Sequence, residues 1–185
     1  MRKAHAPDSI SDLLLNVADR CSVLKPPKVV RTGIGVWNPP PFGALFFNVD
    51  GSARGNPGNA GIGGVLCDHS GKVLGSFSRN IGIVDAITAE LSAIHQACVL
   101  CANSLGLIGK RITILSDSKV AVLWVNSASF GSLKFVNLIY DIRSLLSLLD
   151  GTEIIFNPRN SNSLVDSLAK KGSNEDGDLL LWEVA

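Results

Sequence analysis

The chain has 185 residues, which is enough for one domain with a full hydrophobic core and short extensions, but not for a second domain. Hydrophobic residues make up 46% of it, yet no stretch approaches about 18 uninterrupted apolar residues, so we expect no membrane span. The formal net charge of +1 is close to neutral, but the charges are unevenly distributed along the chain.

The amino-terminal residues and the cysteines indicate the compartment. The opening Met1-Arg2-Lys3 is basic, but the apolar run at 13–15 is too short to be the core of a secretory signal. The four cysteines show no framework spacing, which favours reduced thiols. We therefore expect an intracellular protein, with nucleus, cytoplasm and organelle left open.

Residues 1–42 are predicted to form an extension of one helix and a proline-rich linker. Apolar residues recur at helical spacing from Ser9 to Leu24, and Pro26 then ends the helix. The run that follows, up to Pro41, is rich in proline and glycine, as in an extended linker. This extension carries six Lys and Arg against three Asp and Glu, so it is basic.

The next stretch, from Phe46 to Gly58, joins an apolar strand to a glycine-rich turn, with Asp50 between them. The apolar run predicts a buried strand, and the glycines and Pro57 predict a turn. Asp50 would then lie on the rim of a sheet, where a charge can meet a ligand. The alternative is a turn aspartate that accepts hydrogen bonds from its own backbone.

Two further strands are predicted to form an antiparallel meander with the first. The second is expected at 60–67 and the third at 72–79, with a short hairpin signal at 68–71 between them. The pair Gly61-x-Gly63 is similar to part of a dinucleotide-binding fingerprint. Because a hairpin follows it instead of a helix, we exclude that function.

A helix expected from Asp85 to Cys101 presents an inward stripe of small residues. Glu90 lies on this stripe, and a buried glutamate needs a partner, a metal ion or a proton. The stripe also contains Cys98 and Cys101, a C-x-x-C pair without a second pair of ligands nearby. We expect these cysteines to pack in the core rather than to bind metal.

The rest of the chain alternates strands and helices. The predicted elements are a strand at 110–117, helices at 118–126 and 134–149, a strand at 152–157 and a helix at 161–171. Asp117 ends the first of these strands, Asp166 lies in the last helix, and Gly172 is expected to cap that helix. Residues 173–185 contain four acidic residues and no basic ones, which predicts an acidic tail.

Together these elements predict an α/β fold with a five-stranded mixed sheet, three antiparallel strands followed by two parallel ones, flanked by helices. In such a sheet Asp50 and Asp117 meet at one edge, and Glu90 can point down from the covering helix. Clustered carboxylates repel one another unless divalent cations neutralise them, and oxygen ligands favour Mg²⁺ or Mn²⁺. Such a site suits the hydrolysis of phosphodiesters.

Six short motifs follow one another in order along this part of the chain. They are Asn48-Val49-Asp50-Gly51-Ser52, Gly55-Asn56-Pro57-Gly58, Gly63-Gly64-Val65, Thr88-Ala89-Glu90-Leu91, Ser116-Asp117-Ser118 and Asn162-x-x-x-Asp166-Ser167-Leu168-Ala169-Lys170. Together they resemble type 1 ribonuclease H, and in particular the ribonuclease-H-like domains of plant retroelement reverse transcriptases. We therefore expect an extension at 1–42, a ribonuclease-H-like domain at 43–172 and the acidic tail at 173–185.

This resemblance implies an endonuclease that hydrolyses the RNA strand of RNA–DNA hybrids with two divalent ions, Mg²⁺ or Mn²⁺. The implied metal ligands and catalytic residues are Asp50, Glu90, Asp117 and Asp166, with Asp50 bridging the ions. The implied substrate contacts are Gly51, Ser52, Gly55, Asn56, Lys119 and Asn162. The turn that contains Asn56 would enter the minor groove of the hybrid. For Lys119, a solvated helix residue is an equal alternative.

The charge of the predicted domain agrees with a nucleic-acid partner. Residues 43–172 contain eleven Lys and Arg against nine Asp and Glu. If four of those acids bind metal, five remain, and an excess of six positive charges favours a polyanionic partner. We expect an RNA–DNA hybrid as partner, no membrane, and either a monomer or the tail of a larger reverse-transcriptase-like protein.

Two departures from the family leave alternatives open. Phe156 stands where the family commonly has a histidine that assists proton movement or product release, six residues before Asn162. A basic extension between the helices at 118–126 and 134–149 is also missing. The protein is therefore expected to be a slower hydrolase, or else a catalytically weak or inactive retroelement-derived module that binds nucleic acid or another partner. A different reaction on the same fold is the third alternative.

Overall fold

A computed structural model describes residues 43–128, 131–158, 163–174 and 177–184. The helix and linker predicted within residues 1–42 lie outside these ranges and stay predictions. In chain order the elements are β1 (Leu45–Gly55), β2 (Gly58–Asp68), β3 (Val73–Val84), α2 (Ala86–Ala102), η1 (Leu105–Leu107), β4 (Ile112–Ser116), α3 (Lys119–Asn126), η2 (Leu133–Phe135), α4 (Val136–Leu148), β5 (Glu153–Phe156), α5 (Ser163–Asn174) and β6 (Leu179–Trp182).

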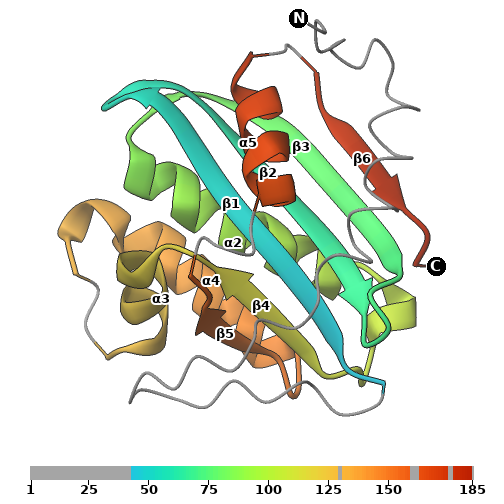
Figure 1. Ribbon diagram of the computed structural model, residues 1–185. Helices are drawn as coiled ribbons and strands as arrows, with labels where there is room; N and C mark the ends of the chain where they lie inside the picture. The colour runs from blue at the N-terminus through green and yellow to red at the C-terminus, as the bar shows by residue number, and fades with distance from the viewer. Residues whose placement is uncertain (1–42, 129–130, 159–162, 175–176, 185) are drawn as a thin grey trace, which may run out of the picture.

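In the described part of the chain, six strands form one mixed sheet in the order β5-β4-β1-β2-β3-β6 (Figure 1). β1 is antiparallel to β2 on one side and parallel to β4 on the other. β3 continues the antiparallel part, and β5 continues the parallel part. The predicted α/β fold with a mixed sheet is confirmed, and the sheet has one strand more than expected.

The additional strand, β6, lies where the sequence predicts only an acidic tail. It pairs antiparallel with β3, with Trp182 opposite Gly75. The Trp182 ring lies 5.9 Å from the ring of Phe47, centroid to centroid, and its indole N–H donates to Ser104 Oγ at 2.7 Å. Leu179, Leu181 and Trp182 are half-buried, whereas Leu180 is exposed. The acidic residues on both sides of this apolar run make the segment look like a charged tail in the sequence.

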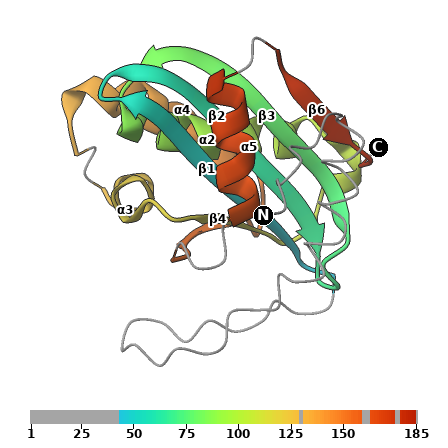
Figure 2. The ribbon, with the colours of Figure 1, turned by 45° about the horizontal axis from the view of Figure 1, so that its top comes forward.

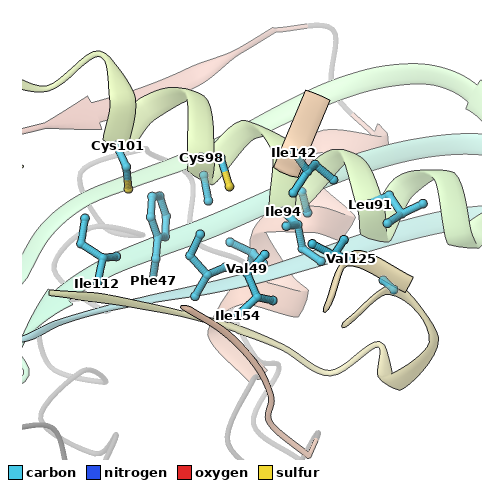
Figure 3. Packing of buried hydrophobic residues seen from close by; sticks show 14 of the residues in the cluster. Phe47, Val49, Leu91, Ile94, Cys98, Cys101, Ile112, Val125, Ile142 and Ile154 are labelled. Carbon is cyan, nitrogen blue, oxygen red and sulfur yellow. The ribbon is translucent and has the colours of Figure 1, made fainter. Parts of the chain in front are cut away.

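Helices cover both faces of the sheet (Figures 1 and 2). α2, α3 and α4 lie on one face and α5 lies on the other, across β1, β2 and β3. The main core fills the space between the sheet and α2 and includes Val49, Ile94 and Ile142 (Figure 3). Among the described residues, no helix combines the length and the apolar character that crossing a membrane requires.

Cys98 and Cys101 pack in this core, as the sequence predicts (Figure 3). Both thiols are buried and reduced. Burial raises the pKa of each thiol to about 12, so both stay protonated at neutral pH. Their role is to fill space between α2 and the sheet.

Glycines let α5 lie directly on the sheet. A Cβ atom at Gly61 would lie 2.2 Å from the backbone nitrogen of Ser173. Likewise, a Cβ atom at Gly172 would lie 2.5 Å from the carbonyl oxygen of Arg79. Because α5 continues to Asn174, the predicted cap at Gly172 is wrong. That glycine lies inside the helix, where the contact with the sheet leaves no room for a side chain.

Candidate metal centre

The parallel register of β1 and β4 brings Asp50 and Asp117 together. Their last ladder pair joins Val49 to Ser116, and each carboxylate belongs to the residue that follows. β4 ends at Ser116, whereas β1 continues along β2 as far as Gly55. The expectation that Asp50 lies at the end of its strand is therefore wrong, because the glycine-containing segment after it keeps pairing with β2. Asp50 lies inside β1, at the point where the neighbouring strand β4 stops.

Glu90 reaches these residues because α2 lies against the backbone of β1. A Cβ atom at Gly51 would lie 2.3 Å from the carbonyl carbon of Ala89 and 2.4 Å from the backbone nitrogen of Glu90. Only a glycine at position 51 permits this approach without a shift of the helix. The sequence predicts Gly51 as a substrate contact, and the structure gives it a packing role at the site.

The three carboxylates form one compact group. One oxygen atom each from Asp50, Glu90 and Asp117 lies within 4.8 Å of the other two. Asp50 is 4% exposed and Glu90 is 8% exposed, so water screens their charges poorly and like-charge repulsion is strong. A bound cation would remove this repulsion. The all-oxygen donor set fits a hard divalent ion such as Mg²⁺ or Mn²⁺.

Asp166 lies in the first turn of α5 and is not one of the three clustered residues. Its Oδ2 atom accepts from Lys170 Nζ at 2.7 Å, one helical turn further on. The side chain is half-buried. Asn162, predicted one turn before Asp166 as a substrate contact, lies outside the described residues.

The turn between β1 and β2 packs against the N-terminus of α2. Asn56 is exposed, and its side-chain oxygen accepts from the backbone N–H of Ala86 at 3.3 Å. Ser52 is half-buried in β1, and Gly55 has a φ of 112°, a value that favours glycine. The turn that contains the residues predicted to meet the substrate is thus held beside the N-terminus of α2.

Asp85 caps α2 and joins it to the segment before α4. The carboxylate accepts from the backbone N–H of Thr88 at 2.8 Å and forms an ion pair with Lys134 of η2. The pKa of Asp85 is lowered to about 2, chiefly by the hydrogen bond from Lys134 and also by the bonds from Thr88, which together outweigh the opposing effect of burial. From the sequence Asp85 is expected only to begin a helix, and its pair with Lys134 is not predicted.

Lys119 begins α3, two residues beyond Asp117. Its side chain is exposed. The helix is capped by Ser118, whose Oγ atom accepts from the backbone N–H of Ala121 at 3.3 Å. An exposed lysine at the start of α3 agrees with both interpretations of Lys119. It can contact a nucleic-acid backbone, and it can be a solvated helix residue.

Phe156 is the last residue of β5 and pairs with Ser116, the residue before Asp117. Its side chain is 39% exposed. The next residue, Asn157, is buried, and its backbone N–H donates to the carbonyl oxygen of Ser116 at 2.8 Å. Asn157 is not among the residues that the sequence predicts for the site. The signal that could have indicated it is a polar residue directly after the apolar run of β5.

The sequence profile of a protein family described as reverse transcriptase-like matches residues 48–172 of this chain. A protein of Arabidopsis thaliana that carries a provisional ribonuclease H name is 34% identical over 143 residues. That match covers 77% of this chain and 22% of the Arabidopsis protein. The chain therefore spans about a fifth of the length of this relative.

Solved structures of ribonuclease H1 proteins share the fold. The enzyme of the halophilic archaeon Halobacterium salinarum is 27% identical with a TM-score of 0.64, over 70% of this chain and 97% of the archaeal one. LC11-RNase H1, isolated from compost by a metagenomic approach, was solved in complex with an RNA/DNA hybrid. It is 25% identical with a TM-score of 0.64, over 70% of this chain and 96% of that chain. Both matches cover nearly the whole of the other protein.

Proposed function

Because this chain belongs to the reverse transcriptase-like family, we propose that it is a ribonuclease of the ribonuclease H type, acting on the RNA strand of RNA–DNA hybrids. The carboxylate group formed by Asp50, Glu90 and Asp117 is the observation that carries the proposal. The similarity to ribonuclease H1 proteins, one of them solved with an RNA/DNA hybrid, supports the choice of substrate. The same fold hosts other reactions, so the assignment depends on the site and not on the fold alone.

The residues of the site have separate tasks in this proposal. By the family resemblance, Asp50 would be the ligand shared by two divalent ions, Mg²⁺ or Mn²⁺. Glu90 and Asp117 would each complete the shell of one ion, and Asp166 is proposed as the fourth ligand. When bound, such ions activate a water molecule and stabilise the leaving oxygen of the phosphodiester. Asp166 would exchange its bond with Lys170 for a metal contact.

The substrate contacts remain those suggested by the resemblance. Ser52, Gly55 and Asn56 would face the minor groove of the hybrid, where 2′-hydroxyl groups distinguish RNA from DNA. Lys119 would contact a phosphate from the start of α3, and Asn162 would reach the hybrid from the segment before α5. These contacts read shape and backbone, so we expect little base specificity.

The experiment that tests the proposal is hybrid cleavage under titration with Mg²⁺ and Mn²⁺. We expect the full chain to cut the RNA strand of a hybrid but not duplex DNA. The substitution Asp50→Asn keeps the shape of the side chain and removes one charge, so we expect a loss of activity of at least about 100-fold.

Asp150→Asn is the matched control, because Asp150 is exposed in the turn before β5. Its activity should equal that of the wild type. Folded wild-type protein that cuts no hybrid with either metal would disprove the proposed function.

A second candidate function is a nucleic-acid-binding module without turnover. The observation in its favour is Phe156, because a phenyl ring cannot move a proton where the family commonly has a histidine. This alternative predicts that the chain binds a hybrid and that Asp166→Asn leaves the affinity unchanged, which a fluorescence anisotropy titration would measure. Robust turnover by the wild type would rule it out.

A further inference from the structure

The end of β5 lies beside the carboxylate group and carries a polar residue there. The ladder between β4 and β5 ends with the pair Ser116 and Phe156. One residue further on, the backbone N–H of Asn157 donates to the carbonyl oxygen of Ser116 at 2.8 Å. This hydrogen bond continues the ladder and holds Asn157 next to Asp117, the residue that follows Ser116.

Side-chain alternation places Asn157 and Asp117 on the same face of the sheet. Ile114 and Ile154 are a ladder pair, and both are buried in the core on the α2 side, where Figure 3 shows Ile154. Asp117 and Asn157 each follow three residues later, so both belong to the opposite face. Phe156 follows Ile154 by two residues and belongs to the α2 side. The residue on the same face as the Asp117 carboxylate is therefore Asn157, which directly follows β5, and not Phe156.

The burial of Asn157 supports a specific role for its amide. Its side chain is 7% exposed, compared with 39% for Phe156. A buried amide group costs stability unless hydrogen bonds satisfy it. An ionised carboxylate only accepts hydrogen bonds, and an asparagine amide offers two N–H donors. Asp117, which the strand register places beside Asn157 on this face of the sheet, is a carboxylate that can accept from such a donor.

We infer that Asn157 is a positioning residue of the metal centre, whose side-chain amide donates to the Asp117 carboxylate and turns one of its oxygens toward Asp50 and Glu90. The inference rests on the proposed function in one respect, namely that the carboxylate group binds a divalent ion. Contacts of this kind typically change metal affinity by about 10- to 100-fold, because they fix the orientation of a ligand before the ion arrives.

Calorimetric titration of the full chain with Mn²⁺, without nucleic acid, tests the inference. The side chains introduced by Asn157→Val and Asn157→Thr have nearly the same shape, but only threonine has a hydroxyl group that can donate a hydrogen bond. We expect Asn157→Val to weaken Mn²⁺ binding about 10-fold and Asn157→Thr to recover a large part of that loss. Ile155→Val is the control on the same strand and should bind Mn²⁺ as the wild type does. Equal affinities of the wild type and both Asn157 variants would overturn the inference.

A second measurement needs no substitution. In the nuclear magnetic resonance spectrum of the wild type, the side-chain amide signals of Asn157 should shift when Mg²⁺ is added, and unchanged signals at saturating Mg²⁺ would overturn the inference. The two proposals fail in different ways. A wild-type protein that binds Mn²⁺ but cuts no hybrid disproves the proposed function, and the titrations still decide on Asn157. A wild-type protein that binds neither ion overturns both proposals.

Discussion

Gly51 sets the distance between α2 and β1 at the metal centre. The backbone of Ala89 and Glu90 occupies the space that a side chain at position 51 would need. The carboxylate of Glu90 thereby comes within reach of Asp50 on the neighbouring residue of the strand. Gly51, which has no side chain, thus controls the distance between the carboxylates of Asp50 and Glu90.

Gly51→Ala should destabilise the protein and weaken its metal site. The new methyl group would lie 2.3 Å from the carbonyl carbon of Ala89, so α2 has to move. Overpacking of this kind costs about 1–3 kcal/mol in free energy of unfolding, which a urea denaturation curve measures. Gly177→Ala is the control, because a Cβ atom there meets nothing within 4 Å. Equal midpoints for the two variants would contradict the packing role of Gly51.

The sequence predicts some residues of the site better than others, because only some of them lie on or next to a clear strand or helix pattern. Asp50, Glu90 and Asp117 each follow or lie on a clear strand or helix pattern, so sheet register and helix face were enough to expect them together. Asp166 and Asn157 depend on the packing of α5 and on where β5 ends. A single sequence does not show either of these, because both follow from contacts between distant segments.

At the scale of elements, the N-terminus of α2 contacts two other parts of the chain. The β1–β2 turn contacts it through Asn56, and η2 contacts it through the ion pair between Lys134 and Asp85. The sequence contains no basic extension between α3 and α4. In the segment that connects them, η2 is paired with the N-cap residue of α2 through Lys134 and Asp85.

The pair between Asp85 and Lys134 should give a pH-dependent contribution to stability. The pKa of Asp85 falls from 3.8 to about 2 on folding, so the stabilisation is present above about pH 4 and is lost as the pH falls toward 2. Since the Lys134 side chain is 63% exposed, we reduce the expected contribution to about 1 kcal/mol. Lys134→Met should lose this amount at pH 7 in urea denaturation, and its difference from the wild type should shrink between pH 4 and pH 2.

Lys110→Met is the control for this prediction, because Lys110 is exposed. It should resemble the wild type at every pH. A difference between Lys134→Met and the wild type that stays constant from pH 7 to pH 2 would show that the charge of Asp85 is not involved.

Most elements of the sheet could be predicted from their patterns, and the exceptions have physical causes. The strands β1 to β3 are longer than expected. In β1 the reason is that Gly51, which indicates a turn in the sequence, also fits a paired strand where α2 packs closely over it. β6 was missed because four acidic residues outweigh its apolar run. The wrong cap at Gly172 has the same origin as the long strands, since close packing of α5 requires the glycine.

For the molecule as a whole, the proposed metal site lies where three separate elements meet. Asp50 belongs to β1 and Glu90 to α2, and Asp117 directly follows β4. Unfolding separates these residues along the chain, so the unfolded state cannot offer the same site. Any ion that binds there therefore stabilises the folded protein as a whole.

Metal removal should lower the melting temperature of the wild type. Binding at 100 times the dissociation constant adds about 2.7 kcal/mol of stability, and differential scanning calorimetry with Mg²⁺ or with a chelator measures the change. Asp50→Asn should be more stable than the wild type in the chelator, because one repelling charge is gone, and it should respond little to Mg²⁺. Asp150→Asn should respond as the wild type does. A wild type whose melting temperature is the same in Mg²⁺ and in chelator would argue against a metal site.

The strand β6 determines which edge the sheet presents to other molecules. The family match ends at residue 172, and a fragment cut there would expose the backbone of β3, which is 12 residues long. β6 is 4 residues long and pairs with β3 from Gly75 to Ser78. The backbone groups of that part of β3 are therefore not offered to the strand of another copy. We expect β6 to shorten the open edge of the sheet in this way, on the side opposite the parallel strands β4 and β5.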